Sequence, residues 1–132
     1  MILENQVVSL ELAKKLKELG FKQESLFWWQ KFSLSNKPKV FLGQCETLNG
    51  LKEYSISAYT VAELGEMLPR SISDKGRCYF LRSKPEFENN GWACQYTTST
   101  GLTLHFEEAP IEADARAKML IYLKENNLLE GK

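Results

Sequence analysis

The sequence predicts a single α+β domain spanning residues 1–132, in which an antiparallel sheet of about five or six strands carries the N- and C-terminal helices on one face. Apolar residues recur with helical spacing near both ends of the chain, and they alternate with polar residues from Arg77 onward. With 132 residues, 43% of them hydrophobic, the chain can bury a core that needs neither a metal ion nor a disulfide bond.

The first helix is predicted over residues 9–19. Ser9 is of a residue type that caps helix N-termini, and Leu12 and Leu16 recur on one face. Gly20 follows the apolar stripe, at the position where a left-handed conformation commonly ends a helix. We therefore expect this helix to bury one stripe and to expose its lysines.

Strands are predicted at residues 26–32, 39–45 and 52–57. The first is dense in aromatic residues, and the third alternates apolar with polar side chains, which is typical of a half-buried sheet. Thr60 and Glu63 then have the spacing of a capping box, in which each side chain accepts a hydrogen bond from the other residue's backbone N–H. This pair predicts the start of a short second helix.

The C-terminal half predicts a hairpin with its loop at residues 99–101. If these three residues form the loop, with Gly101 in a left-handed conformation, Cys94 lies opposite Phe106. A two-residue loop would instead set Cys94 against His105 and would move the apolar row onto the polar face. The longer loop is therefore predicted, with even-numbered side chains beneath the helices and with His105 pointing away from Cys94.

The last helix is predicted to begin near Pro110 or Ile111, because proline is tolerated in the first turn of a helix. Glu112 and Asp114 would then lie near the positive end of the helix dipole, where acidic side chains are favoured. Ala113 and Ala117 recur on one face and would let the helix approach a sheet closely. The expected element is an amphipathic helix docked on the sheet.

The net charge argues against a polyanionic partner. Seventeen basic residues balance seventeen acidic ones, so nucleic acid and anionic membrane are both disfavoured as partners. The charges are nevertheless unevenly distributed, because residues 70–84 contain five basic residues and one acidic residue, whereas residues 86–114 contain six acidic residues and no lysine or arginine. These two stretches either neutralise each other as neighbours or form opposite poles.

The sequence also predicts a cytoplasmic protein. The first residues lack the basic group of a signal peptide, and no apolar stretch approaches the roughly 20 residues that a bilayer requires. The three cysteines are odd in number and form no CxxC pair, which favours reduced thiols over a disulfide framework. No cofactor and no membrane segment are expected.

Few residues suggest chemistry. His105 is the sole histidine, which excludes a cluster of histidine ligands, and no catalytic or metal-binding residue is assigned. The cysteines are expected to behave as small buried hydrophobes. Trp28 and Trp29 are neighbours in a predicted strand, so only one of them can face the core. The candidate binding residues are Trp28, Trp29, Tyr59 and His105.

Three segments carry a resemblance to a known family: SLELAKKLKELGF at residues 9–21 with QES at residues 23–25 after it, YTVAELGEMLP at residues 59–69 and EADARAKMLIYL at residues 112–123. They resemble a family of small uncharacterised proteins that are encoded by bacteriophages, prophages and other mobile elements. The resemblance implies a mobile-element origin and action inside a bacterial cell. It carries over no catalytic residue, because no reaction is established for that family.

These observations leave three functional hypotheses. The leading one is a non-enzymatic accessory protein that binds another protein or a second copy of itself as a homo-oligomer. The second is an enzyme or small-ligand-binding protein whose pocket lies between the sheet and a helix, with Tyr59, His105 and a carboxylate as its polar groups. The third is a single-stranded nucleic-acid binder that uses the aromatic residues near Trp28 and their neighbouring lysines.

Overall fold

The structure is a computed structural model that describes residues 3–32, 37–42, 52–86 and 90–129. Residues 43–45 of the strand predicted at 39–45, and with them Cys45, lie outside these ranges. The elements that the structure describes are, in chain order, η1 (Leu3–Asn5), α1 (Leu10–Glu18), β1 (Phe27–Phe32), β2 (Lys39–Leu42), β3 (Lys52–Ser57), α2 (Val61–Met67), β4 (Ser71–Asp74), β5 (Arg77–Glu86), β6 (Gly91–Thr97), β7 (Thr103–Ala109) and α3 (Glu112–Glu125).

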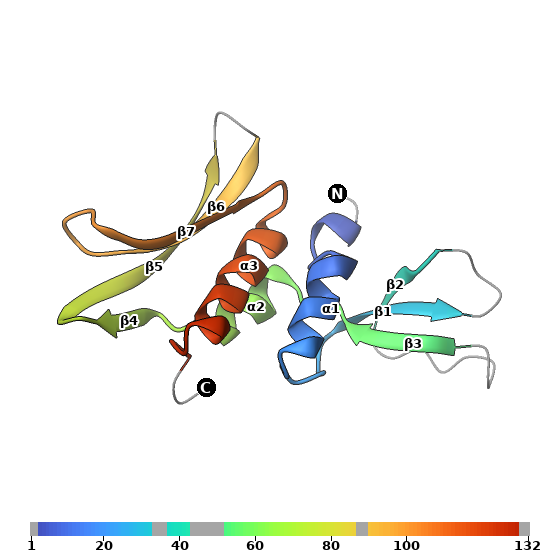
Figure 1. Cartoon of the computed structure of the whole chain (residues 1–132). Coiled ribbons are helices and arrows are strands. Elements are labelled where there is room, and N and C mark those ends of the chain that lie inside the picture. The colour runs from blue at the N-terminus through green and yellow to red at the C-terminus, as the bar shows by residue number, and fades with distance from the viewer. Residues whose placement is uncertain (1–2, 33–36, 43–51, 87–89, 130–132) are drawn as a thin grey trace.

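The strands form two antiparallel sheets with the helices between them (Figure 1). One sheet has the order β2-β1-β3 and the other has the order β4-β5-β6-β7. The α+β class is confirmed, but the single sheet of five or six strands is wrong. An alternating strand shows only that one of its faces is buried, and strands of two sheets around a shared helical layer have the same pattern as strands of one sheet.

Helix α3 is the centre of this arrangement. It contacts β5, β6 and β7 on one side and both α1 and α2 on the other, while α1 also contacts β3. The prediction that the first and last helices share one face of one sheet is therefore wrong. Because α3 is covered on several sides, it is more extensively buried than the predicted amphipathic helix. Its buried residues are Ala113, Ala115, Ala117, Met119, Leu120, Ile121 and Leu123.

Helices α1 and α3 run side by side in the same direction, since Ser9 lies near Asp114 and Lys15 lies near Glu125. Ser9 is the N-cap residue of α1, as predicted, but its side chain makes no capping hydrogen bond. Its backbone N–H instead donates to Asp114 Oδ1 at 2.7 Å. The predicted helix end is confirmed, because Gly20 adopts a φ of 90°.

The capping box at the start of α2 is confirmed. Glu63 N–H donates to Thr60 Oγ1 at 3.1 Å, and Thr60 N–H donates to Glu63 Oε1 at 2.9 Å. This helix packs on α3 through Gly65, where an added Cβ atom would overlap the guanidinium of Arg116. The absence of a side chain at Gly65 is therefore what allows Arg116 to lie across α2.

The loop of the β6–β7 hairpin matches the prediction. Thr98 N–H donates to the Leu102 carbonyl oxygen at 2.8 Å, and Gly101 has a φ of 99°. Beyond the loop, however, the register shifts by one residue, so that His105 lies opposite Tyr96 and Phe106 lies opposite Gln95. The predicted pairing of Cys94 with Phe106 is therefore wrong.

A β-bulge at Leu104 explains the shift, because β7 advances two residues from Thr103 to His105 while β6 moves one residue along. Leu104 packs against the hydrophobic core, and the ring of His105 stacks on Tyr122 of α3. Two consecutive side chains thus face α3, which a regular strand does not allow.

The bulge exchanges the two faces of β7 relative to the prediction. His105 lies on the same face as Cys94, which is the face toward α3, and the prediction that it points away from Cys94 is wrong. Phe106 lies on the opposite face with 38% of its surface exposed. Phe80 and Cys78 are also exposed rather than buried, because β5 presents its odd-numbered residues to the helices.

Strand β4 was not predicted. It is only four residues long and mostly polar, with the sequence Ser-Ile-Ser-Asp, and Ile72 is its buried residue. It joins β5 through Lys75 and Gly76, whose φ values of 50° and 80° are those of a tight hairpin turn. The glycine in this turn was the available indication of a hairpin.

The hydrogen bond between Ser9 and Asp114 gives a test of how α1 docks on α3. Asp114→Ala leaves the Ser9 N–H without its acceptor, and we expect a loss of about 1–3 kcal/mol in the free energy of unfolding. Asp114→Asn retains an acceptor and is the matched control. Urea unfolding of the two variants measures the difference, and equal stabilities would contradict the account.

The environment of Asp114 also predicts that the stability of the fold depends on pH. Burial raises the pKa of the Asp114 carboxyl above its ordinary value, despite the opposing hydrogen bond from Ser9. The folded state therefore holds this proton more tightly than the unfolded state does. Stability contributed by Asp114 should decrease as pH rises from the ordinary value of about 3.9 through the raised pKa. Relative to Asp114→Asn, the wild-type protein should lose stability across that window.

Candidate functional site

The two tryptophans of β1 point to opposite sides of the three-stranded sheet. Trp29 is buried and its Nε1–H donates to the Val8 carbonyl oxygen at 2.8 Å, which fastens the sheet to the segment before α1. Trp28 lies opposite Ser57 of β3 and is half-buried. Trp29 is thus a core residue, and the half-buried Trp28 does not offer a large exposed aromatic surface.

Tyr59 is held within the fold. It is 2% exposed, and its hydroxyl donates to the Lys22 carbonyl oxygen and accepts from Gln23 Nε2 at 3.5 Å. Burial raises the pKa of this hydroxyl above its ordinary value. These contacts tie the loop after α1 to the end of β3, and they leave the hydroxyl little freedom to act on a ligand.

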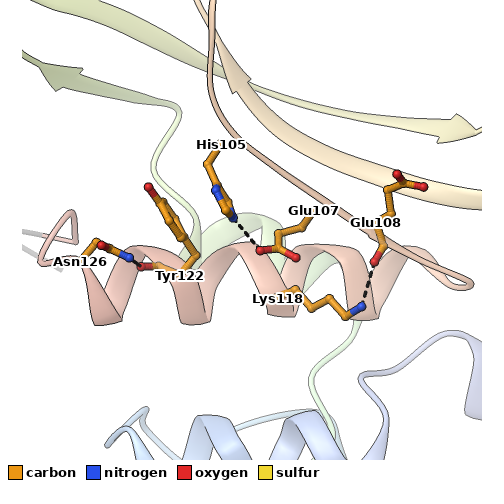
Figure 2. Close-up of polar contacts among 6 residues, drawn as sticks. All are labelled: His105, Glu107, Glu108, Lys118, Tyr122 and Asn126. Carbon is orange, nitrogen blue, oxygen red and sulfur yellow. Dashed lines mark hydrogen bonds and ion pairs between the residues drawn. The ribbon is translucent and has the colours of Figure 1, made fainter.

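His105 lies between β7 and α3 (Figure 2). Its ring stacks on Tyr122 with centroids 3.4 Å apart, and its Nε2 lies 2.6 Å from Glu107 Oε2. Figure 2 also shows Lys118, which donates to the Glu108 carbonyl oxygen at 2.9 Å and so fastens α3 to β7. The imidazole is therefore held on one face by a ring and at one nitrogen by a carboxylate.

A second polar cluster lies between α3 and the four-stranded sheet. Glu112 Oε2 accepts from Ser83 Oγ at 2.9 Å and from Arg116 Nη2 at 3.0 Å. Arg116 Nη1 also donates to the Val61 carbonyl oxygen at 3.3 Å. The Glu112 and Arg116 side chains are each 20% exposed, so this ion pair joins the sheet, α3 and α2 in a partly desolvated position.

Cys94 lies opposite Glu107 in the sheet and is fully buried. Burial raises the pKa of its thiol to about 12, although the positive charge of Arg116 acts in the opposite direction. A thiol with this pKa is protonated at neutral pH and is a poor nucleophile. The prediction that Cys94 behaves as a small hydrophobe agrees with this environment, whereas Cys78 is exposed.

The side of the β4–β7 sheet that faces away from α3 is here called the outer face. It carries Phe80, 48% exposed, and Phe106, 38% exposed. In the register of the sheet, Arg82 of β5, Gln95 of β6 and Phe106 of β7 form one row across three strands. The outer face of β5, β6 and β7 includes Phe80, Arg82, Lys84, Glu86, Ala93, Gln95, Thr97, Thr103, Phe106 and Glu108.

Sequence reasoning did not identify the outer face as a candidate site. It placed Phe80 and Phe106 in the core, because an alternating strand does not reveal which of its faces carries the helices. A polar residue, Gln95, lies between two buried residues of β6. Its alignment with Arg82 was the available indication of which side of this sheet faces solvent.

A hollow of about 500 Å³ lies where the start of β1, the start of α2 and the start of α3 meet. Phe27 and Trp92 approach it from the two sheets, and Glu112 contributes a carboxylate. Neither Tyr59 nor His105 lines it. The polar groups that were predicted to share a pocket are therefore not brought together in this one, and Glu112 is already bound to Arg116.

The described residues contain neither a metal-binding cluster nor a membrane-spanning helix. No group of three or more His, Cys, Asp or Glu side chains there is placed to hold a metal ion. None of the described helices is both long enough and apolar enough to span a bilayer.

Comparisons of the chain with protein-family models, with curated proteins and with solved structures find no match.

The environments of Cys78 and Cys94 predict opposite reactivities. With a pKa of about 12, Cys94 has roughly one thiolate in ten thousand molecules at pH 8, and its sulfur is also shielded from reagent. In native protein, iodoacetamide should therefore label Cys78 and not Cys94, as measured by mass spectrometry of the digested chain. Unfolding in urea should expose Cys94 to labelling. Equal labelling of the two thiols in native protein would contradict this placement.

Proposed function

We propose that the chain is a non-enzymatic binding module that recognises a protein partner, either a different protein or a second copy of itself, through the outer face of the β4–β7 sheet. The observation that carries the proposal is the exposure of Phe80 and Phe106 on the side of the sheet away from α3. Full burial of a phenylalanine side chain stabilises a complex by up to roughly 1.5–3 kcal/mol. Two such residues on one face therefore offer a substantial contact.

Arg82 adds to this surface. It lies on the same face of β5 as Phe80 and in the same row as Phe106. Among the residues that the structure describes, none forms a hydrogen bond or ion pair with its guanidinium. Arginine and aromatic residues commonly contribute most of the binding energy at protein interfaces. Their combination on one open sheet face supports a protein contact.

The reactive groups within the described residues support a binding role over catalysis. His105 is stacked on Tyr122 and bonded to Glu107, Cys94 is a buried thiol, and Glu112 is bound to Arg116 and Ser83. His105 and Glu112 each join two elements of the fold, and Cys94 packs in the core. Their contacts account for their positions without a substrate.

A single-stranded nucleic acid is the alternative partner for this face, because exposed aromatic rings beside Arg82 and Lys84 can stack bases and bind phosphates. Glu108 lies in the same row as Lys84 and introduces a negative charge on this face. A surface with charges of both signs is better suited to a protein than to a polyanion.

We also propose that the module is an accessory protein of a bacteriophage or other mobile element and acts in the bacterial cytoplasm. The resemblance of residues 9–21, 59–69 and 112–123 to the mobile-element family supports this origin. A pull-down from bacterial cells that carry the parent element tests it. Stoichiometric recovery of one protein encoded by the element or its host is the expected result.

The outer face gives a direct test of the proposed function. The double variant Phe80→Ser/Phe106→Ser should remain folded, because both side chains are exposed, and should melt within a few degrees of the wild-type protein. It should bind the captured partner at least roughly 30-fold more weakly, which corresponds to the loss of about 2 kcal/mol. Affinity for the recovered partner is measured by calorimetry.

Leu26→Ser is the matched control, because Leu26 is 57% exposed but lies before β1 and not on the outer face. It should leave the affinity unchanged. An unchanged affinity in the double variant would overturn the proposal. Retention of wild-type protein on a short single-stranded oligonucleotide, weakening steeply with salt, would assign the face to nucleic acid instead.

A further inference from the structure

The charged residues of the outer face are arranged asymmetrically about β6. On one side of β6, β5 carries the exposed cations Arg82 and Lys84 and, at its end, the half-buried anion Glu86. On the other side, β7 carries Phe106 and the anion Glu108. Phe80 and Phe106 are thus also divided between the two flanking strands.

The rows of the sheet define which residues would meet if two such faces were stacked. In the register, Arg82 shares a row with Gln95 and Phe106. Lys84 shares the next row with Ala93 and Glu108. Two sheets pack face to face at about 10 Å with their strands within about 30° of each other.

A two-fold axis that runs along β6, between two stacked copies, places β5 of each copy over β7 of the other. Each row then lies over the same row of the second copy in reverse order. Arg82 lies over Phe106 of the partner subunit, where a guanidinium can bind the face of the ring. Lys84 lies over Glu108 of the partner subunit, which joins opposite charges at two symmetric positions.

The centre of the two rows is also compatible with this axis. Gln95 would meet Gln95 of the partner subunit, and an amide can donate to and accept from another amide. Ala93 lies between Lys84 and Glu108 and is fully buried within the chain, so the surface that a partner meets in this row is formed by these two exposed side chains.

We propose that the outer face is a homodimer interface, with a two-fold axis parallel to β6 that pairs Lys84 with Glu108 of the partner subunit and Arg82 with Phe106 of the partner subunit. This inference rests on the proposed function and names the partner of that face. The second copy is favoured over a polyanion because the face carries both signs of charge in positions that complement each other under this rotation.

Charge reversal at the two paired positions tests the axis. In Lys84→Glu, and equally in Glu108→Lys, a homodimer would place like charges opposite each other at both symmetric positions. Each variant alone should therefore raise the dimer dissociation constant by about tenfold or more. An equimolar mixture of the two variants restores an opposite-charge pair at both positions, and it should form a heterodimer as tight as the wild-type homodimer.

The full-length chain is used throughout, with an affinity tag on one variant to separate the masses. Sedimentation equilibrium measures the homodimers, and native mass spectrometry measures the mixed species. Lys17→Glu changes charge equally on the exposed surface of α1 and is the matched control. It should leave the dissociation constant unchanged. Circular dichroism and thermal melting of each variant exclude misfolding as the cause of dissociation.

A wild-type chain that sediments as a monomer at all concentrations, or variants that fail to associate when mixed, would overturn the dimer. If another protein is then captured through Phe80 and Phe106, the proposed function stands and only the identity of the partner is wrong. If the wild-type chain neither dimerises nor captures a protein through those residues, both the dimer and the proposed function fail.

Discussion

The bulge at Leu104 determines which residues of β7 face the helices and which face solvent. With this one extra residue, Leu104 joins the core, His105 stacks on Tyr122 and Phe106 faces outward. A regular strand continuing the register of the loop would instead bury Phe106 and expose His105. The exposure of Phe106 on the outer face therefore depends on the β-bulge at Leu104. The packing of Leu104 in the core and of His105 on Tyr122 favours this bulge.

The position of α3 in the fold explains why its reactive side chains form structural contacts. Because it lies between a sheet on one side and two helices on the other, each polar group it carries in this layer needs a partner within the fold. Asp114 accepts from the Ser9 backbone, Glu112 binds Ser83 and Arg116, and Tyr122 stacks on His105. None of the described helices lies on the outer face of the β4–β7 sheet, where Phe80 and Phe106 are exposed.

Local features of the fold could be predicted because they depend on neighbours in the sequence. The Thr60–Glu63 capping box, the helix end at Gly20 and the hairpin loop ending at Gly101 each follow from a few adjacent residues. The division into two sheets depends on long-range packing around α3. The bulge likewise depends on contacts between β7 and a helix several residues later, so the true surroundings of His105 and the outer face could not be predicted.

The register of β6 and β7 is the most direct test of this account, and nuclear Overhauser contacts measured in solution report it. The structure predicts cross-strand backbone contacts between Gln95 and Phe106, and ring-to-ring contacts between His105 and Tyr122. Backbone contacts that pair Cys94 with Phe106 would contradict it. That result would turn Phe106 toward α3 and remove the exposed apolar surface on which the proposed binding role depends.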